Sequence, residues 1–341
     1  MVGTAVRSAL PTGLLLTGVA APGRAEEGLP IGYPLSYLSG FGPKADPVVT
    51  QLYGIIAISL LVVVIVAVLV LFGAFSRRTR PEDGRLASVP LERSGQGLAL
   101  IYVGSGLSFF ALFGTALWGY FVLADIAGPK GDTPVTIRVT GQQWWWEVEY
   151  LSPEPWRIFT TADEIHIPVG QPVRVELRSA DVIHSFWVPA LSGKMDTIPT
   201  QENETWIQAD VPGVYRGQCA EYCGRQHAHM AFLVTAEPPE QFEAWWQEQL
   251  KGAPMPPAAF MQNCAVCHAV RGTPAQGRFG PNLSHLMQRK TIAAGTLPNT
   301  VGNLSGWISN PQRIKPGNEM PTLTLSTTEL AAITSYLLTL R

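Results

Sequence analysis

The longest apolar stretches of the chain lie near its start. Residues 47–76 and residues 97–124 each contain no charged side chain. Either run is long enough to cross the hydrocarbon core of a bilayer as a helix, and a buried helix of a soluble domain rarely needs so many unbroken apolar residues. The pattern therefore predicts a two-helix transmembrane hairpin over residues 47–124.

The connection between the two apolar runs is rich in arginine, with Arg77, Arg78, Arg80, Arg85 and Arg93. Since short cytoplasmic loops are enriched in basic residues, this connection is expected to be cytoplasmic, which leaves both flanks of the hairpin outside. Residues 1–25 combine Arg7, the apolar stretch GLLLTGVAA and a small residue at Ala25, a pattern typical of a secretory signal peptide. The chain after residue 124 is therefore expected to fold outside the cytoplasm.

A shorter hydrophobic period follows over residues 130–237. Short runs of alternating polarity are separated there by Gly, Pro and Asp, and in PVRVELRS the residues Val173, Val175 and Leu177 alternate with charged side chains. Such alternation is typical of half-buried strands. Several strands at this spacing predict an all-β domain, an antiparallel sandwich or barrel.

The rest of the chain favours helices. Residues 239–250 predict a helix and residues 251–259 a stiff, Pro-rich linker, so residues 238–259 are interpreted as one connecting segment. Residues 260–341 predict an all-α domain. Its last helix is expected to begin near Thr327, Thr328 and Glu329.

Charge divides the exported part of the chain into two segments. The formal net charge of the whole chain is −2, but residues 125–251 hold 9 basic against 18 acidic residues, a net of −9, and residues 252–341 hold 7 against 2, a net of +5. Opposite net charges predict complementary surfaces on the two segments. Because the chain as a whole has no basic excess, we do not expect it to bind nucleic acid.

Cysteine, histidine and methionine gather in the stretch CAEYCGRQHAHM, which starts at Cys219. Cys219 and Cys223 could form a disulfide, which an exported segment permits, or bind zinc together with two histidines. The thioether of Met230 favours copper, because copper accepts this soft ligand and zinc seldom uses it. His184, at the start of an earlier apolar run, adds an imidazole from another strand. His229 is interpreted as an exposed or packing residue.

These residues resemble those of a known family. DVIHSFWVPALSGKMDTIP together with GQCAEYCGRQHAHM is similar to the dinuclear copper (CuA) domain of cytochrome c oxidase subunit II, a cupredoxin-like Greek-key barrel that binds two copper ions. The resemblance implies that the Glu221 side chain reaches a magnesium ion shared with subunit I. The copper ligands that it implies are His184, Cys219, the backbone carbonyl of Glu221, Cys223, His227 and Met230.

Three tryptophans follow one another in GQQWWWEVEY. A strand would place Trp144 and Trp146 on one face and Trp145 on the other, where aromatic packing or a belt above the membrane would explain them. The same family carries a similar Gly-His-Gln-Trp-Tyr-Trp stretch whose first Trp receives electrons from cytochrome c. The resemblance therefore implies that Trp144 is an electron-entry residue, with Gln142 and Trp145 in place of the family's His and Tyr.

The pattern CAVCH is typical of covalent haem c attachment. Cys264 and Cys267 would form thioethers with the haem, and His268 would be an axial ligand. The segment resembles a small class I cytochrome c domain, whose second axial ligand is commonly a Met. With this assignment all four cysteines of the chain are used, and no pair remains for a disulfide.

Three methionines are candidates for the second axial ligand of the haem: Met261, Met287 and Met320. Met320 is favoured because it lies in a loop bounded by Gly and Pro, well after His268 and before the last helix. The alternative for Met320 is a packing role in the core, and this is the preferred interpretation of the other two.

The whole chain resembles the form of subunit II of a bacterial haem-copper oxidase that carries a fused cytochrome c. The resemblance implies a two-pass protein of the bacterial inner membrane whose copper and haem domains lie on the periplasmic face, with oxidase subunits I and III as partners. Electrons would pass from a periplasmic cytochrome c or similar donor to haem c, to CuA and to subunit I, where oxygen is reduced to water with proton translocation.

No residue of this chain is expected to act as a catalytic acid, base or nucleophile. Two alternatives stay open on the sequence. One is the copper-bearing subunit of a nitric oxide reductase, in which the same relay serves a different partner. The other is a membrane-anchored copper and haem electron carrier without an oxidase partner.

Overall fold

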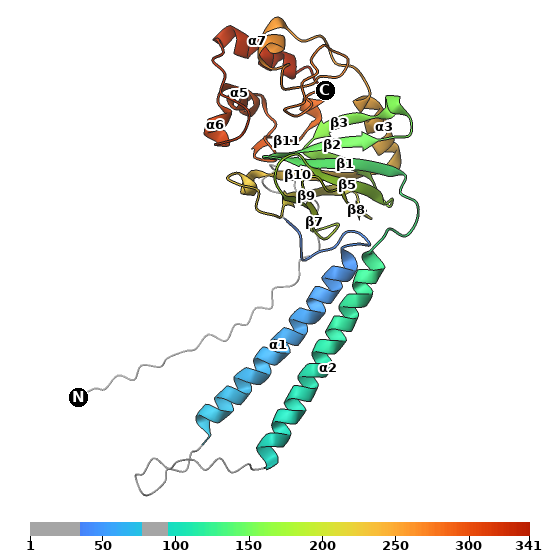
Figure 1. Ribbon diagram of the computed structural model, residues 1–341, viewed down its shortest axis with the longest axis vertical. Coiled ribbons are helices and arrows are strands. Elements are labelled where there is room, and N and C mark those ends of the chain that lie inside the picture. The colour runs from blue at the N-terminus through green and yellow to red at the C-terminus, as the bar shows by residue number, and fades with distance from the viewer. Residues whose placement is uncertain (1–34, 77–94) are drawn as a thin grey trace, which may run out of the picture.

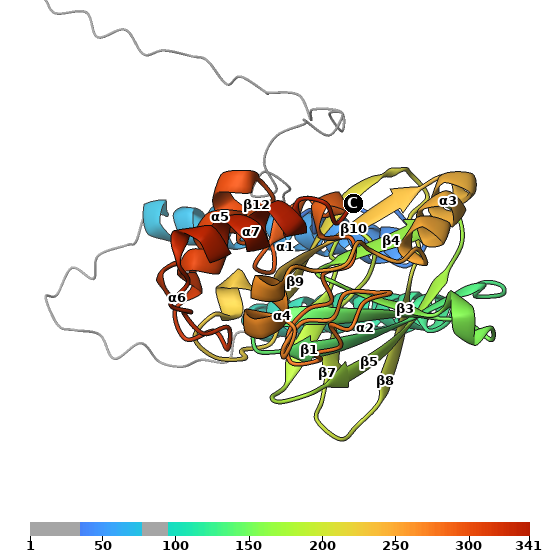
Figure 2. The same cartoon turned by 90° about the horizontal axis from the view of Figure 1, so that it is seen from above.

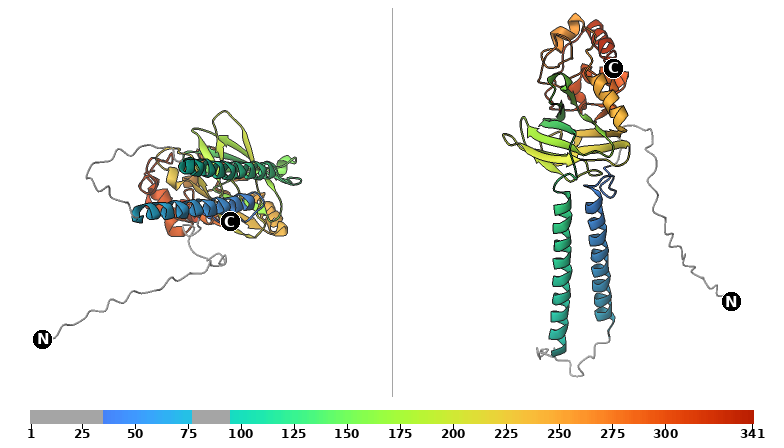
Figure 3. Two further views of the ribbon diagram at one scale, coloured as in Figure 1. Left: turned by 90° about the horizontal axis from the view of Figure 1, so that it is seen from below. Right: turned by 90° about the vertical axis from the view of Figure 1, so that its right-hand side faces the viewer.

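Two long helices form one end of the molecule in the computed structural model, which describes residues 35–76 and 95–341. Helices α1 (Asp46–Phe75) and α2 (Gly95–Ile126) lie side by side (Figures 1 and 3). Their most apolar windows are 0% and 6% buried within the protein, and both helices are long and apolar enough to cross a membrane. Apolar surfaces of this size need a lipid environment, which agrees with the predicted hairpin. The Arg-rich connection and the predicted signal peptide lie outside the described residues.

Two five-stranded sheets pack face to face above these helices. One sheet has the order β3-β2-β1-β5-β8 and the other the order β4-β10-β9-β6-β7. The strands are β1 (Val135–Gln142), β2 (Trp145–Leu151), β3 (Phe159–Ala162), β4 (Glu164–Pro168), β5 (Val173–Ser179), β6 (His184–Trp187), β7 (Met195–Thr197), β8 (Asn203–Ile207), β9 (Gly213–Cys219) and β10 (Ala231–Glu237).

The expected alternation of buried and exposed residues is confirmed in these strands. Along β5, Val173, Val175 and Leu177 are fully buried while the charged residues between them are not. The expectation of purely antiparallel pairing was wrong for two pairs, because β1 pairs with β5 and β4 pairs with β10 in parallel. The chain crosses to the other sheet at β4 before it returns in β5, and such a crossover permits parallel neighbours.

Helix α3 (Pro239–Gln249) is the helix predicted after the β domain, and it packs on that domain with its aromatic face. Phe242 and Trp246 are buried, and Trp246 stacks edge-on against Tyr150 and Phe159. Residues 251–257 have no regular structure, yet they are held against the last domain. The Ala253 N–H donates to the carbonyl of Arg271, and the Tyr336 hydroxyl donates to the carbonyl of Pro254.

The C-terminal domain is helical, as predicted, with one short hairpin. Its helices are α4 (Ala258–Asn263), α5 (Val301–Ser309), α6 (Pro311–Ile314) and α7 (Thr327–Leu337), and its hairpin is β11 (Thr291–Ile292) with β12 (Leu297–Pro298). Single 3₁₀ turns occur at Pro155–Arg157, His227–His229 and Leu286–Gln288. The predicted start of the last helix is confirmed, and its N-cap is Ser326, which forms a capping box with Glu329.

The C-terminal domain sits on the β domain on the side away from α1 and α2 (Figures 1 and 2). Its loops meet the turn between β1 and β2 and the turn between β3 and β4. Lys315 of the C-terminal domain donates to the carbonyl of Trp144 in the first turn, and Thr291 donates to Glu164 just after the second. Two segments far apart in sequence therefore share one interface.

Candidate metal centre and haem pocket

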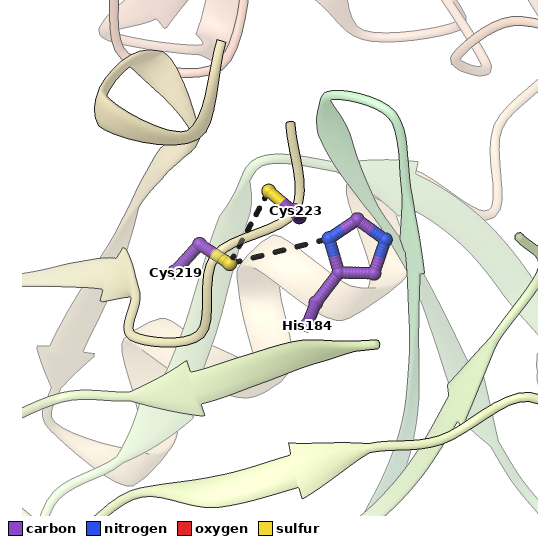
Figure 4. Close-up of side chains that lie close together, drawn as sticks. All are labelled: His184, Cys219 and Cys223. Atoms are coloured by element: carbon purple, nitrogen blue, oxygen red, sulfur yellow. Dashed lines mark hydrogen bonds between the residues drawn. The ribbon is translucent and has the colours of Figure 1, made fainter. Parts of the chain in front are cut away.

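The candidate copper ligands come together where β6, β9 and the loop after β9 meet. His184 is the first residue of β6 and Cys219 the last residue of β9, and these strands are neighbours in one sheet, with Phe186 opposite Cys219. Cys223 follows in the loop, and Figure 4 shows its sulfur and the His184 ring both facing the Cys219 sulfur. The sheet order thus explains how residues 35 positions apart reach one site.

The donor atoms of this cluster lie within a few ångströms of one another. The Cys219 sulfur is 3.8 Å from the Cys223 sulfur and 4.0 Å from Nδ1 of His184. The Cys223 sulfur is 3.5 Å from Nδ1 of His227 and 3.8 Å from the sulfur of Met230. His184, Cys219, Cys223 and Met230 are all buried. Each of these side chains from the sequence-based ligand set is therefore directed into one site.

The two thiols are suited to a cation between them. Both cysteines are free, and a separation of 3.8 Å is nearly twice the length of a disulfide bond, which is about 2 Å. The contact between the two thiols, helped by His184, lowers the pKa of Cys219, while the same contact and burial raise the pKa of Cys223. Two adjacent buried thiolates repel each other, so both can ionise only when a metal ion neutralises them. This donor set of sulfur and imidazole fits copper.

Glu221 presents two different groups from the same loop. Its carbonyl oxygen accepts a hydrogen bond from the Cys219 thiol at 3.3 Å, so it belongs to the cluster. Its carboxylate is half-exposed and lies 3.7 Å from Nζ of Lys194. His229 turns away from the cluster, with Nδ1 2.8 Å from Oε1 of Gln226. The structure thus places His229 outside the group of candidate ligands.

Asp181 is a residue of this site that the sequence analysis missed. Its carboxylate is 2.8 Å from Nε2 of His184, and it also accepts the backbone N–H of Gln143 at 2.6 Å. An N–H at Nε2 leaves the Nδ1 lone pair of His184 directed at the cluster, the orientation that a metal ligand needs. The only signal in the sequence is an acidic residue three positions before a histidine, which is too common to be recognised.

A second site is a cavity of about 290 Å³ in the C-terminal domain. Cys264, Cys267, His268 and Met320 all line it, together with apolar side chains from α4, α5 and α7. Of the three candidate methionines, Met320 lines the cavity and the other two pack in the surrounding core. A mostly apolar cavity that is lined by both cysteines and the histidine of the CAVCH pattern fits a haem group.

The loop after the CAVCH pattern orients His268. Its Nδ1 lies 2.8 Å from the carbonyl of Pro281, so an N–H there donates to the carbonyl and leaves Nε2 free to bind iron. Burial lowers the pKa of His268, which keeps the imidazole neutral. A Cβ atom at Gly280 would lie 2.6 Å from Cε1 of His268, so only glycine fits against the ring at this position.

Trp144 lies between the two sites, and Trp145 lies beside the second. Trp144 is in the turn between β1 and β2 and not in the strand, is 8% exposed, and donates from Nε1 to the carbonyl of Cys223 at 2.9 Å. Gln143, Trp144 and Trp145 also line the haem cavity. Trp146 is fully buried in the core of the β domain. An interfacial belt above the membrane is therefore the wrong interpretation, because the C-terminal domain covers these residues.

Four charged residues meet at the same interface: Asp163, Glu164, Arg289 and Lys315, here called the charge cluster. One oxygen of Glu164 accepts the backbone N–H groups of Lys290 at 2.6 Å and Thr291 at 2.9 Å. Asp163 accepts the N–H of Trp146 at 2.8 Å and attracts both Lys315 and Arg289. The complementary charges predicted for the two segments are thus found at their contact, but most of the short contacts are made by backbone groups.

Glu164 makes the stability of this interface depend on pH. Burial raises the pKa of Glu164 from 4.5 to about 7, against the opposing effects of two backbone N–H groups, Arg289 and Lys290. Between these values the native protein keeps a proton that the unfolded chain has released, so the free energy of unfolding falls as the pH rises. In Glu164→Gln we expect the free energy of unfolding to fall by roughly 3 kcal/mol less than in the wild type as the pH rises from 4.5 to about 7.

The measurement is chemical denaturation of the full chain in detergent at several values from about pH 5 to about pH 8. Glu204→Gln is the control, because Glu204 is an exposed carboxylate at the surface of the same domain. Parallel pH profiles for the wild type and Glu164→Gln would contradict the assignment.

Comparisons with known proteins agree with this arrangement. The family model described as cytochrome c oxidase subunit II, periplasmic domain, matches residues 149–237, and the model described as cytochrome c matches residues 257–341. The "Cytochrome c oxidase subunit 2" of Alkalihalophilus pseudofirmus is 34% identical to this chain over 322 residues, covering 90% of this chain and 91% of the relative. The protein of the same name from Bacillus sp. strain PS3 is 35% identical over 246 residues, covering 65% and 67%.

One solved structure with a similar sequence is the periplasmic domain of subunit II of cytochrome oxidase (CoxB) from Bradyrhizobium japonicum. The two sequences are 33% identical over the alignment, which covers 35% of this chain and 95% of the CoxB domain. The TM-score is 0.32. These similarities extend over the β domain, the C-terminal domain and, for the first relative, nearly the whole chain.

Proposed function

Because this chain belongs to the cytochrome c oxidase subunit 2 family and is thus a subunit of a haem-copper terminal oxidase, we propose that it carries electrons from a periplasmic donor to subunit I. The proposed route runs from a cytochrome c or similar donor to haem c, then to a dinuclear copper centre, then to subunit I, where oxygen is reduced to water with proton translocation. The two apolar helices anchor the protein in a membrane. We propose the bacterial inner membrane, with both domains on the periplasmic face and subunit III as a further partner.

The residues proposed to hold the two groups are those that the structure brings together. Haem c would be attached through Cys264 and Cys267 and ligated by His268 and Met320, which all line one cavity. When bound, the coppers and the haem would supply one-electron redox chemistry. The proposed copper ligands are His184, Cys219, the Glu221 carbonyl, Cys223, His227 and Met230.

The position of Trp144 is the observation that carries this proposal. Its indole donates to the carbonyl of Cys223, and the same residue lines the cavity that contains His268. One aromatic side chain is thus in contact with both proposed redox sites and is shielded from solvent. We therefore propose that Trp144 receives electrons from the haem domain of its own chain and not directly from a soluble protein.

Glu221 supports the proposed contact with subunit I. Its carbonyl is part of the cysteine cluster, while its half-exposed carboxylate lies near Lys194 and is accessible to a partner. A carboxylate oxygen is a suitable ligand for magnesium. This loop would then connect the copper centre to a magnesium ion that is shared with subunit I.

Metal and haem analysis of the purified oxidase complex tests the proposal. We expect a pair of coppers with a near-infrared mixed-valence band, one covalently attached haem per copy of this chain, and oxygen uptake with a reduced donor. After rapid mixing with that donor, the haem absorbance should change before the copper band. A single copper, or a haem that organic solvent extracts, would contradict the assignment of these residues.

A further inference from the structure

The loop that leads to Met320 also contacts the β domain. It consists of Lys315, Pro316 and Gly317 and is called here the junction loop. The carbonyl of Pro316 accepts a hydrogen bond from Nε2 of Gln226 at 2.7 Å, and Gly317 packs beside Arg225. Gln226 and Arg225 belong to the loop that carries the candidate copper ligands Cys223 and His227. The junction loop of the C-terminal domain therefore contacts the loop that carries the candidate copper ligands.

Lys315 is the most deeply buried residue of the junction loop, with 2% of its surface exposed. Its Nζ donates to the carbonyl of Trp144 at 2.7 Å and to the carbonyl of Ala293 at 3.1 Å. An ammonium group loses its hydration when it is buried, so it needs such acceptors and a nearby negative charge. Asp163 in the turn between β3 and β4 provides the negative charge.

Trp144 is consequently held at both ends. Lys315 holds its backbone carbonyl from the C-terminal domain, and the carbonyl of Cys223 holds its indole N–H from the β domain. The adjacent Gln143 side chain also donates to the carbonyl of Cys223, at 2.7 Å. Rotation of the indole or displacement of its backbone would break at least one of these hydrogen bonds.

We propose that Lys315 is a positioning residue that fixes Trp144 between the haem cavity and Cys223, so that electrons cross between the domains without domain movement. This proposal rests on the proposed function. Further contacts across the interface support a fixed arrangement, because Glu164 accepts two backbone N–H groups of the C-terminal domain and the Ala231 N–H donates to the carbonyl of Ala294. These hydrogen bonds hold the two domains in one fixed arrangement.

The test compares the intact oxidase complex with Lys315→Met, which has a side chain of similar length without charge or N–H donors. Electron exchange between haem and copper is measured after flash reduction of the haem. We expect it to slow by on the order of 10- to 100-fold, since a displacement of about 1 Å has an effect of this size on a positioned reaction. The KM for the soluble donor and the near-infrared band of the copper centre should not change, which separates positioning from general damage.

Hydrogen exchange provides a second measurement that does not depend on turnover. In Lys315→Met the backbone amides of residues 142–146 should exchange faster, while those of β5 should not. Arg313→Gln is the matched control, because it removes one positive charge from an exposed position on α6. Its transfer rate should stay within about twofold of the wild type, as for most surface substitutions.

Transfer in Lys315→Met within about twofold of the wild type would overturn the positioning role. Should Lys315→Met fail to assemble, Lys315→Leu, which also lacks the charge and the N–H donors, takes its place with the same supporting and opposing results. Absence of haem-to-copper transfer in the wild-type complex would contradict the proposed function. The hydrogen-exchange comparison would then still show whether Lys315 fixes the backbone of Trp144.

Discussion

Replacing Cys223 with alanine is expected to abolish the copper centre and to lower oxygen uptake from the reduced donor by at least about 100-fold. Loss of a residue that only supports a ligand already reduces metal affinity by about 10- to 100-fold, and Cys223 is proposed as a ligand itself. Its sulfur contacts Cys219, His227 and Met230, so three other candidate ligands lose a neighbour. Copper content and the near-infrared band of the purified complex measure the first effect, and an oxygen electrode measures the second.

Tyr222→Phe serves as the control for Cys223→Ala. Tyr222 precedes Cys223 in the same loop, but it is 76% exposed, and the substitution removes only its hydroxyl. Copper content, covalent haem and oxygen uptake should therefore remain near those of the wild type. If Cys223→Ala retains the full copper content and the near-infrared band, the ligand set proposed for this loop is wrong.

Replacing Asp163 with alanine is expected to lower the free energy of unfolding at about pH 7 by about 3 to 5 kcal/mol, the range for breaking a buried ion pair from one side. Burial raises the pKa of Asp163 to about 6 and lowers the pKa of Lys315 to about 8, so both groups are largely charged at this pH. Its loss leaves the buried Lys315 ammonium without its negative neighbour and the Trp146 N–H without an acceptor. Denaturation of the full chain in detergent gives the change.

Two comparison variants are needed to interpret the effect of Asp163→Ala. Asp163 has φ +60°, a left-handed conformation that asparagine tolerates better than alanine, so Asp163→Asn should cost less than Asp163→Ala. Glu204→Ala breaks the exposed pair with Arg174 and should cost no more than about 1 kcal/mol. Equal losses in Asp163→Ala and Glu204→Ala would show that burial of the charge cluster contributes little.

Most of the candidate ligands could be proposed from the sequence because they lie in one short pattern that resembles a known family. Cys219, Cys223, His227 and Met230 occupy one loop, so their proximity follows from the chain itself. His184 is farther away in sequence, and the structure explains its place by the pairing of β6 with β9. For the same reason the CAVCH pattern and the periodicity of the strands were sufficient to predict two domains of the right fold class.

The interface could not be predicted in the same way. Lys315 and Asp163 are ordinary charged residues in their own segments, and their roles exist only once the two domains are in contact. Net charge predicted complementary surfaces. The hydrogen bonds of the Glu164 carboxylate, however, come mainly from backbone N–H groups, and amino-acid composition cannot predict such contacts. The strand assigned to Trp144 was wrong because β1 ends at Gln142 and the chain turns there.

The burial of Trp144 beneath the C-terminal domain has a consequence for how this oxidase adapts to different redox partners. In the proposed orientation, a soluble donor meets the outer surface of the C-terminal domain, while the aromatic contact to Cys223 remains covered. Exposed residues on that outer surface can therefore diverge, by natural selection or by engineering, to recognise a new donor. The proposed copper ligands need not change with them.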